Sequence, residues 1–178
     1  MGKRSDFKRM KADFYATPES AVKPLLRQLP YGTMFVEPCA GDGALVASLE
    51  SAGMSCLAAC DLYPKADFIE KRDALSSESP ISYFVPASAD YIITNPPWTR
   101  QVLHPMIDEF RKIKPTWLLF DADWKHTVQA APYLKYCHKI VSVGRVSWMG
   151  NGVSGKDNCA WYLFDKQEGA GSFIGRAA

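Results

Sequence analysis

The stretch TMFVEPCAGDG, residues 33–43, decides the fold of this 178-residue chain. Its first five residues read as a short, largely apolar strand that ends at the acidic Glu37. Gly41-Asp42-Gly43 follows at once, and apolar residues then recur at helical spacing over 44–51. Glycines between a strand and a helix let a ligand approach the backbone closely. The stretch therefore predicts a strand, a tight ligand-binding turn and a helix.

The same alternation of strand and helix continues along the chain. We expect helices over 19–29, 44–51, 101–112 and 127–136, and strands over 33–37, 55–60, 67–71, 90–94, 116–120, 139–146 and 159–164. Thr17 is a candidate N-cap of the first helix, Pro18 its first residue and Pro24 a kink. Such alternation predicts an α/β fold with a mostly parallel sheet flanked by helices. The last two strands, joined by a glycine-rich loop, predict an antiparallel final strand.

Length and composition indicate a single ordinary globular domain. The chain is 47% hydrophobic and 22% charged, which excludes a disordered or fibrous class. We expect a basic flexible arm over 1–12, one domain over 13–166 and a C-terminal tail over 167–178. No apolar run is long enough to cross a bilayer, and the N-terminus does not read as a signal peptide. A cytoplasmic protein without membrane contact is expected.

Cysteine and histidine positions argue against a metal centre. The five cysteines have irregular spacings, with no C-x-x-C pair, and the three histidines do not cluster with them. Neither a zinc site nor a disulfide framework is indicated. We expect reduced, mostly buried thiols and no metal.

Polar residues follow the ends of four expected strands: Glu37, Asp61, Asp73 and Asn95. In open parallel sheets, ligands bind at the carboxyl ends of the strands. An acid at the position of Asp61 can accept hydrogen bonds from both ribose hydroxyls of a nucleoside, and Asp73 can contact an adenine amino group. Because the turn is G-x-G and not G-x-G-x-x-G, a dinucleotide is not favoured. The pattern predicts a nucleoside cofactor, although each acid alone also fits a helix cap or a solvated turn.

Asn95-Pro96-Pro97-Trp98 is the most specific signal. Two prolines remove two amide donors and stiffen the chain, so the carbonyls of Asn95 and Pro96 become fixed acceptors. An amide side chain beside a rigid carbonyl can bind both hydrogens of a planar amino group and restore the lone pair of its nitrogen. Trp98 offers a flat face on which an extruded base can stack. The alternative is a strand terminator with a half-buried tryptophan.

With these motifs the chain resembles the Rossmann-like class I S-adenosylmethionine-dependent amino-methyltransferases, which carry [N/D/S]-P-P-[Y/F/W]. The resemblance implies that the strand-one motif holds the methionine part of the cofactor, the acid after strand two the ribose, and N-P-P-W the target amino group. The residues implied for the cofactor are Glu37, Pro38, Ala40, Gly41, Gly43, Asp61, Leu62, Asp73 and Asn95, and those implied for catalysis are Asn95, Pro96, Pro97 and Trp98.

Residues 13–18, DFYATP, resemble the Y-x-T-P segment of many N6-adenine DNA methyltransferases, including small phage-type ones. In that family the segment packs on the cofactor, which makes Tyr15, Thr17 and Pro18 candidate contacts. Residues 157–162 also resemble the last strand of the small members, so the resemblance covers roughly 13–165. It implies methyl transfer to the N6 amino group of adenine in DNA, with the base flipped out, in a bacterial or phage-infected cell.

Basic residues are the candidate nucleic-acid contacts. The arm over 1–11 holds five of them against one acid, a net charge of +4 that suits a phosphate backbone and equally a solvated tail. The candidates are Lys3, Arg4, Lys8, Arg9, Lys11, Arg100 and Lys156. There is no room for a separate target-recognition domain, so the loops over 98–105 and 150–158 and the arm must read the substrate.

Three alternatives stay open at this point. RNA adenine and a protein glutamine are alternative substrates, because the same fold and cofactor would serve either. A catalytically idle nucleic-acid-binding protein of the same fold is the third. The chain acts as a monomer or a homodimer, and its sequence does not decide between them.

Overall fold

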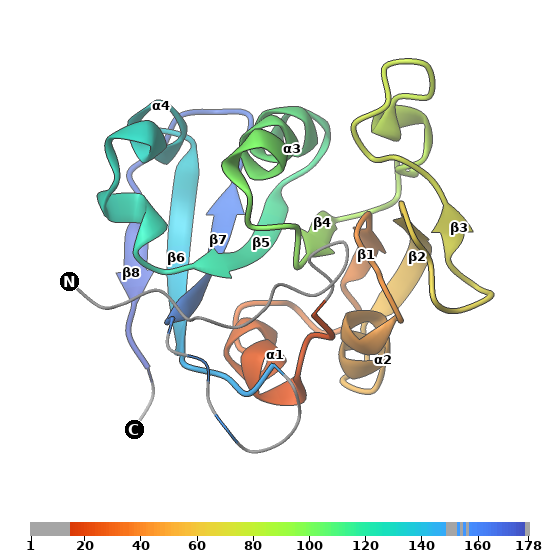
Figure 1. Cartoon of the computed structure of the whole chain (residues 1–178), viewed down its shortest axis with the longest axis horizontal. Coiled ribbons are helices and arrows are strands. Elements are labelled where there is room, and N and C mark those ends of the chain that lie inside the picture. Colours follow the sequence, from red (N-terminus) through yellow and green to blue (C-terminus); the bar gives the residue numbers. More distant parts are fainter. Residues whose placement is uncertain (1–14, 149–152, 154, 156, 177–178) are drawn as a thin grey trace.

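A computed structural model describes residues 15–148, 153, 155 and 157–176, which form an eight-stranded sheet with helices packed on it (Figure 1). The order of strands across the sheet is β3–β2–β1–β4–β5–β7–β6–β8. The strands are β1 (Met34–Glu37), β2 (Ser55–Asp61), β3 (Glu70–Lys71), β4 (Tyr91–Thr94), β5 (Thr116–Asp121), β6 (Cys137–Gly144), β7 (Cys159–Phe164) and β8 (Ser172–Ile174). β7 runs antiparallel to β5 and β6, and all other pairings are parallel. The prediction of a mostly parallel sheet in which the strand over 159–164 runs antiparallel is confirmed.

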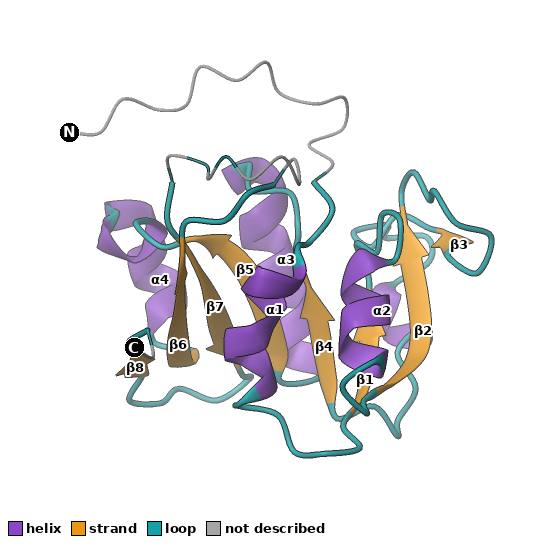
Figure 2. Ribbon diagram, turned by 90° about the horizontal axis from the view of Figure 1, so that it is seen from below, coloured by secondary structure: helices purple, strands orange, loops and turns teal. Residues whose placement is uncertain are grey.

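Helices cover both faces of the sheet. Figure 2 shows α1 and α2 together on one face and α3 on the other. The α-helices are α1 (Glu19–Leu26), α2 (Ala44–Glu50), α3 (Arg100–Ile113) and α4 (Ala131–Leu134), and the 3-10 helices are η2 (Ile81–Tyr83), η3 (Trp124–His126) and η4 (Val128–Ala130). A sheet covered in this way buries both side-chain faces of its central strands.

The central strands divide their side chains between two hydrophobic cores. Within β1, Phe35 joins the core under α1 and α2, and Val36 joins the core under α3. Leu118 and Leu119 of β5 are divided in the same way, and all four side chains are fully buried. This period-2 alternation explains why the central strands read as continuous apolar runs. Two packed cores hold the carboxyl ends of these strands in place as the platform for a site.

Two expected elements are shorter in the structure than the sequence predicts. The expected helix over 127–136 is divided into η4 and the four-residue α4, because Pro132 has no amide hydrogen to extend a longer helix. The expected strand over 67–71 is reduced to β3, whose two residues pair with Cys60 and Asp61 of β2.

Two further differences concern the ends of the domain. Within the expected C-terminal tail, β8 adds a strand beside β6, with Phe173 opposite Ile140. Pro18 is the N-cap residue of α1, not its first helical residue, and no side chain caps this helix. Pro24 lies inside α1, which ends two residues later.

No helix in the described part of the chain is long and apolar enough to cross a membrane. All five cysteines are free thiols, and three of them, Cys60, Cys137 and Cys159, are buried. Burial raises the pKa of the Cys159 thiol to about 12, so this side chain stays uncharged and packs as a small apolar group.

Candidate active site

The glycine turn is held by the loop that follows β2. Gly41 and Gly43 have φ angles of 56° and 82°, the left-handed region that glycine adopts at little cost. The Gly41 amide donates to a carboxylate oxygen of Asp61 at 2.8 Å, and its carbonyl accepts from the Lys65 amide at 2.9 Å. The ring of Phe68 packs so closely on Gly43 that a Cβ there would overlap it. The turn, the end of β2 and the following loop therefore form one unit.

Asp61 lies where the ribose-binding acid was predicted. Besides the Gly41 amide, its carboxylate accepts a hydrogen bond from the Tyr63 amide at 2.7 Å, so each oxygen holds one backbone donor and keeps a second lone pair. Leu62, the next residue, is 46% exposed beside it. Asp73 is exposed and accepts from the Leu75 amide at 2.9 Å. Asp61 therefore contacts the glycine turn, whereas the carboxylate of Asp73 hydrogen-bonds only within its own local turn in the described part of the chain.

Glu37 is the buried acid at the foot of the turn. Its side chain is 1% exposed, and no hydrogen-bond partner for its Oε2 exists among the described residues. Burial raises the pKa of this carboxyl well above its usual range, and the nearby Asp61 and Asp42 raise it further. An orphaned acid beside two others fits a ligand that brings positive charge and hydrogen-bond donors.

We predict that Glu37→Gln stabilises the ligand-free protein above about pH 5, because the amide has no charge to bury. A raised folded-state pKa means that the folded wild type holds a proton that the unfolded chain loses. The wild-type protein therefore has its full stability below pH 4.5, the pKa of this carboxyl in the unfolded chain. Its free energy of unfolding falls as the pH rises from there towards the pKa of the carboxyl in the folded protein. The difference in unfolding free energy between variant and wild type should grow by about 1.4 kcal/mol per pH unit in that window.

Urea denaturation between pH 5 and pH 8 measures this difference. Glu78→Gln is the matched control, because Glu78 is an exposed acid far along the chain from the turn. A Glu37→Gln curve parallel to that of the control across the whole range would mean that Glu37 is ionised in the folded protein.

Asn95 connects the tetrad to the Y-x-T-P segment. Its side-chain amide donates to the Thr17 hydroxyl at 3.2 Å and to the Tyr15 carbonyl at 3.4 Å. The Thr17 oxygen, which the sequence suggested as a helix cap, therefore serves the site. The oxygen Oδ1 of Asn95 accepts from the Trp98 indole at 3.2 Å. Among the described residues no hydrogen bond uses the Pro96 carbonyl, so this acceptor stays available.

Three aromatic rings meet beside the tetrad. Trp98 and Trp148 are arranged edge to face with centroids 5.6 Å apart, and Trp148 meets Tyr15 in the same manner at 6.3 Å. Trp98 is half-buried, and its indole also donates to the Leu119 carbonyl at 3.2 Å. Trp148 comes from the segment after β6. Its contact with Tyr15 and Trp98 makes it a residue of the site.

Sequence comparison alone identifies no family: no family model matches the chain, and no curated protein matches it. Structural comparison does find similar proteins. A candidate RNA methyltransferase from Pyrococcus horikoshii superposes with a TM-score of 0.61 at 17% identity, covering 93% of this chain and 94% of that one. A candidate class I S-adenosylmethionine-dependent methyltransferase from Listeria monocytogenes superposes with a TM-score of 0.59 at 11% identity, covering 95% of this chain and 68% of that one. The chain has the class I methyltransferase fold.

A third structure with the methyltransferase fold is the modification subunit of a candidate type I restriction enzyme from Vibrio vulnificus. It superposes with a TM-score of 0.59 at 13% identity, covering 93% of this chain. The chain spans about half of that subunit, 47% of its length. Identities this low establish the arrangement of elements, so the chemistry has to be argued from the site.

A cavity of about 240 Å³ opens beside the tetrad at the carboxyl edge of the methyltransferase fold. Trp98 lines it together with Asp121, which ends β5, and Trp124 of η3. Arg100, a predicted nucleic-acid contact, lines it as an exposed side chain at the start of α3. The space is large enough for a planar base, and polar and aromatic groups both face it.

Other predicted contacts cannot be placed on the methyltransferase fold. Lys3, Arg4, Lys8, Arg9, Lys11 and Lys156 lie outside the described residues. Within the part that is described, no three His, Cys, Asp or Glu side chains gather as a metal site.

Proposed function

We propose that this chain transfers a methyl group from S-adenosylmethionine to the N6 amino group of adenine in DNA. One observation carries the proposal: in a methyltransferase fold, Asn95-Pro96-Pro97-Trp98 follows β4 at the strand edge that also bears the glycine turn. The Pro96 carbonyl and the second lone pair of Asn95 Oδ1 are then two acceptors for one amino group.

The acids around the glycine turn fit S-adenosylmethionine, which carries a sulfonium and an ammonium group. Glu37 lacks a partner for one oxygen, and Asp42 and Asp61 add negative charge beside it. When bound, the cofactor supplies an electrophilic methyl group. We assign its methionine part to Glu37, Pro38, Ala40, Gly41 and Gly43, its ribose to Asp61, its adenine to Leu62 and Asp73, and packing against it to Tyr15, Thr17, Pro18 and Asn95.

The tetrad would act on the target nitrogen by orientation and fixed polarity. An exocyclic amino group is a poor nucleophile while its lone pair is conjugated with the ring. Hydrogen bonds from its two hydrogens to Asn95 Oδ1 and the Pro96 carbonyl draw the nitrogen towards tetrahedral geometry and free that pair. The indole hydrogen bond from Trp98 holds the Asn95 amide in the required orientation at 3.2 Å. These acceptors belong to rigid groups, so little reorganisation is needed when the amino group arrives.

Aromatic rings at the tetrad support a flipped base as the target. An adenine inside a duplex cannot reach a site at a sheet edge, so it has to be extruded and stacked on an aromatic surface. The ring of Trp98 lines the cavity, and Trp148 packs edge to face against Trp98 with the ring centroids 5.6 Å apart. The substrate side therefore has a stacking partner and room for one planar ring.

RNA adenine is the second candidate substrate, because one structural neighbour is described as an RNA methyltransferase. The tetrad chemistry is the same for both nucleic acids, and single-stranded RNA needs no duplex opening. The restriction-modification neighbour favours DNA. Their identities of 17% and 13% leave the decision to experiment.

The deciding experiment incubates the protein with S-adenosylmethionine labelled with tritium in its methyl group. Duplex DNA, single-stranded DNA, RNA and a protein extract are offered separately, and the labelled product is digested and identified. We expect N6-methyladenine in DNA. Label in RNA adenine or in protein glutamine would mean that this is the substrate and that DNA is not. Cofactor binding with no label in any of the four samples would indicate an idle nucleic-acid-binding protein.

A further inference from the structure

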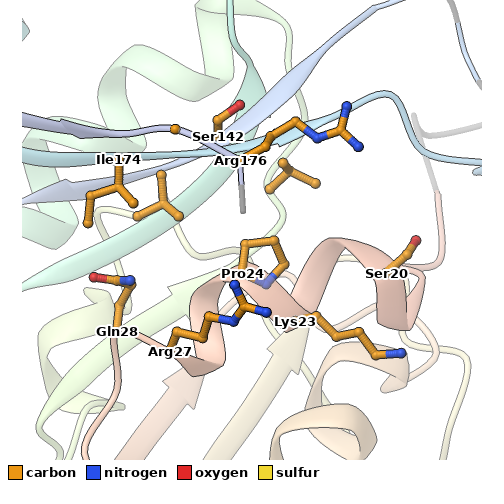
Figure 3. A pocket seen from close by; sticks show the side chains of 11 residues that line it. Ser20, Lys23, Pro24, Arg27, Gln28, Ser142, Ile174 and Arg176 are labelled. Atoms are coloured by element: carbon orange, nitrogen blue, oxygen red, sulfur yellow. The ribbon is translucent and has the colours of Figure 1, made fainter. Parts of the chain in front are cut away.

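A second cavity, of about 280 Å³, lies between α1 and the β6–β8 edge (Figure 3). It shares no lining residue with the glycine turn or the tetrad. Figure 3 shows Lys23 of α1 and Arg27, which follows α1, on one side of the gap and Arg176, which follows β8, on the other. Ser20, Pro24, Val141, Ser142 and Ile174 also line it. We call this feature the α1–β8 groove.

The charge in the α1–β8 groove is positive and largely uncompensated. Among the described residues, three cations and no carboxylate line it. Lys23 pairs with Glu19 at 3.1 Å, but both side chains are well exposed, so water screens this pair. Neither Arg27 nor Arg176 makes an ion pair with any described residue. Like charges gathered in one hollow repel one another, and an anion placed between them removes that repulsion.

Arg176 is held against the backbone at the end of β6. It lies over Gly144, where an added Cβ would meet its guanidinium nitrogen at 3.1 Å. Gly144 ends β6, with a φ angle of 89° that favours glycine. The guanidinium can approach this closely because no side chain intervenes.

One end of the groove lies towards the sheet edge that bears the tetrad, because Ser20 lines it three residues after Thr17 and Arg176 reaches Gly144 at the end of β6. β6 is parallel to β4 and β5 in the sheet, so Gly144 lies on the edge reached by the end of β4. On the other wall, α1 begins two residues after Thr17, whose hydroxyl contacts Asn95. Both walls therefore lead away from the proposed target amino group.

We propose that the α1–β8 groove binds the sugar–phosphate backbone of the nucleic-acid strand that carries the target base. The inference rests on the proposed function and names where its substrate is held. Guanidinium groups match phosphate oxygens in a bidentate manner, and Ser20 and Ser142 add hydroxyl donors. Pro24, Val141 and Ile174 give apolar surface for the sugars. Contacts of this kind position a strand without reading its sequence.

The test compares Arg27→Gln/Arg176→Gln with Lys112→Gln/Lys166→Gln. Both variants lose two positive charges from exposed side chains, and the second pair lies at the opposite edge of the sheet, near the start of β5. Binding to fluorescein-labelled duplex DNA, single-stranded DNA and RNA is measured by anisotropy over a range of salt concentrations. Two lost phosphate contacts should weaken duplex binding about 30-fold near 150 mM salt and reduce the salt slope by about 1.8. The control should change little in either quantity.

Methyl transfer at saturating DNA is the second readout, because it separates the groove from the proposed function. We expect the groove variant to keep the wild-type rate once DNA is saturating, since neither arginine touches the tetrad. Equal affinity and equal salt slopes in the two variants would overturn the groove while leaving methyl transfer intact. A selective loss of binding in a protein that methylates no nucleic acid would support the groove and overturn the proposed function.

Discussion

An Asn95→Ala variant should transfer methyl groups about 10³-fold more slowly than the wild type, while its affinity for S-adenosylmethionine falls far less, because Asn95 only packs against the cofactor. The reason is that Oδ1 accepts one hydrogen of the target amino group, and alanine offers no acceptor there. Single-turnover rates with saturating cofactor and DNA, together with calorimetry for cofactor affinity, measure the two effects separately.

Thr17→Val is the matched control, because Asn95 also has an anchoring role. Its Nδ2 holds the Thr17 hydroxyl at 3.2 Å and the Tyr15 carbonyl at 3.4 Å. The isosteric valine removes one of these acceptors and leaves Oδ1 in place. One hydrogen bond contributes about 1 kcal/mol, so a loss of about fivefold is expected. If Thr17→Val slowed transfer as much as Asn95→Ala, anchoring alone would explain Asn95. Full activity of Asn95→Ala would remove the acceptor mechanism.

The fold could be predicted because its signals are local. Residues 33–43 and the apolar runs of β4 and β5 carry strand, turn and helix patterns within a few neighbours of each other. The short elements could not be predicted in the same way. Ser172–Ile174 has three residues, and it becomes β8 because β6 offers an open edge for parallel pairing.

The site could be predicted only in part, because several of its contacts are long-range. The acids and the tetrad follow strands, so their place at one sheet edge follows from topology. Trp148 has no such signal, since an aromatic residue in a loop packs in a core as readily as it serves a site. The bond between Asn95 and Thr17 joins positions 78 residues apart, and the α1–β8 groove joins α1 to the end of the chain. Such pairings arise from packing, which a single sequence does not display.

Asp61→Ala should weaken binding of S-adenosylmethionine about 100-fold. A hydrogen bond to a charged group contributes about 1.5–3 kcal/mol. The variant removes the carboxylate that accepts from both ribose hydroxyls, and water replaces part of that loss. Asp61 also has a second role, because its carboxylate accepts from the Gly41 and Tyr63 amides at 2.8 and 2.7 Å. Removing the carboxylate therefore also loosens the glycine turn. Asp42→Asn is the control for lost charge, since Asp42 is exposed on the same turn.

A second ligand separates the two roles of Asp61. The 2′,3′-dideoxy analogue of S-adenosylmethionine lacks both ribose hydroxyls and keeps every other group. If Asp61 binds those hydroxyls, Asp61→Ala lowers the affinity for the natural cofactor and hardly changes the affinity for the analogue. Calorimetry on wild type and variant with each of the two ligands gives the coupling energy between Asp61 and the hydroxyls directly. Equal losses for both ligands would mean that Asp61 acts only by holding the turn through Gly41. The ribose would then have to be bound elsewhere, and Asp61 would be a positioning residue.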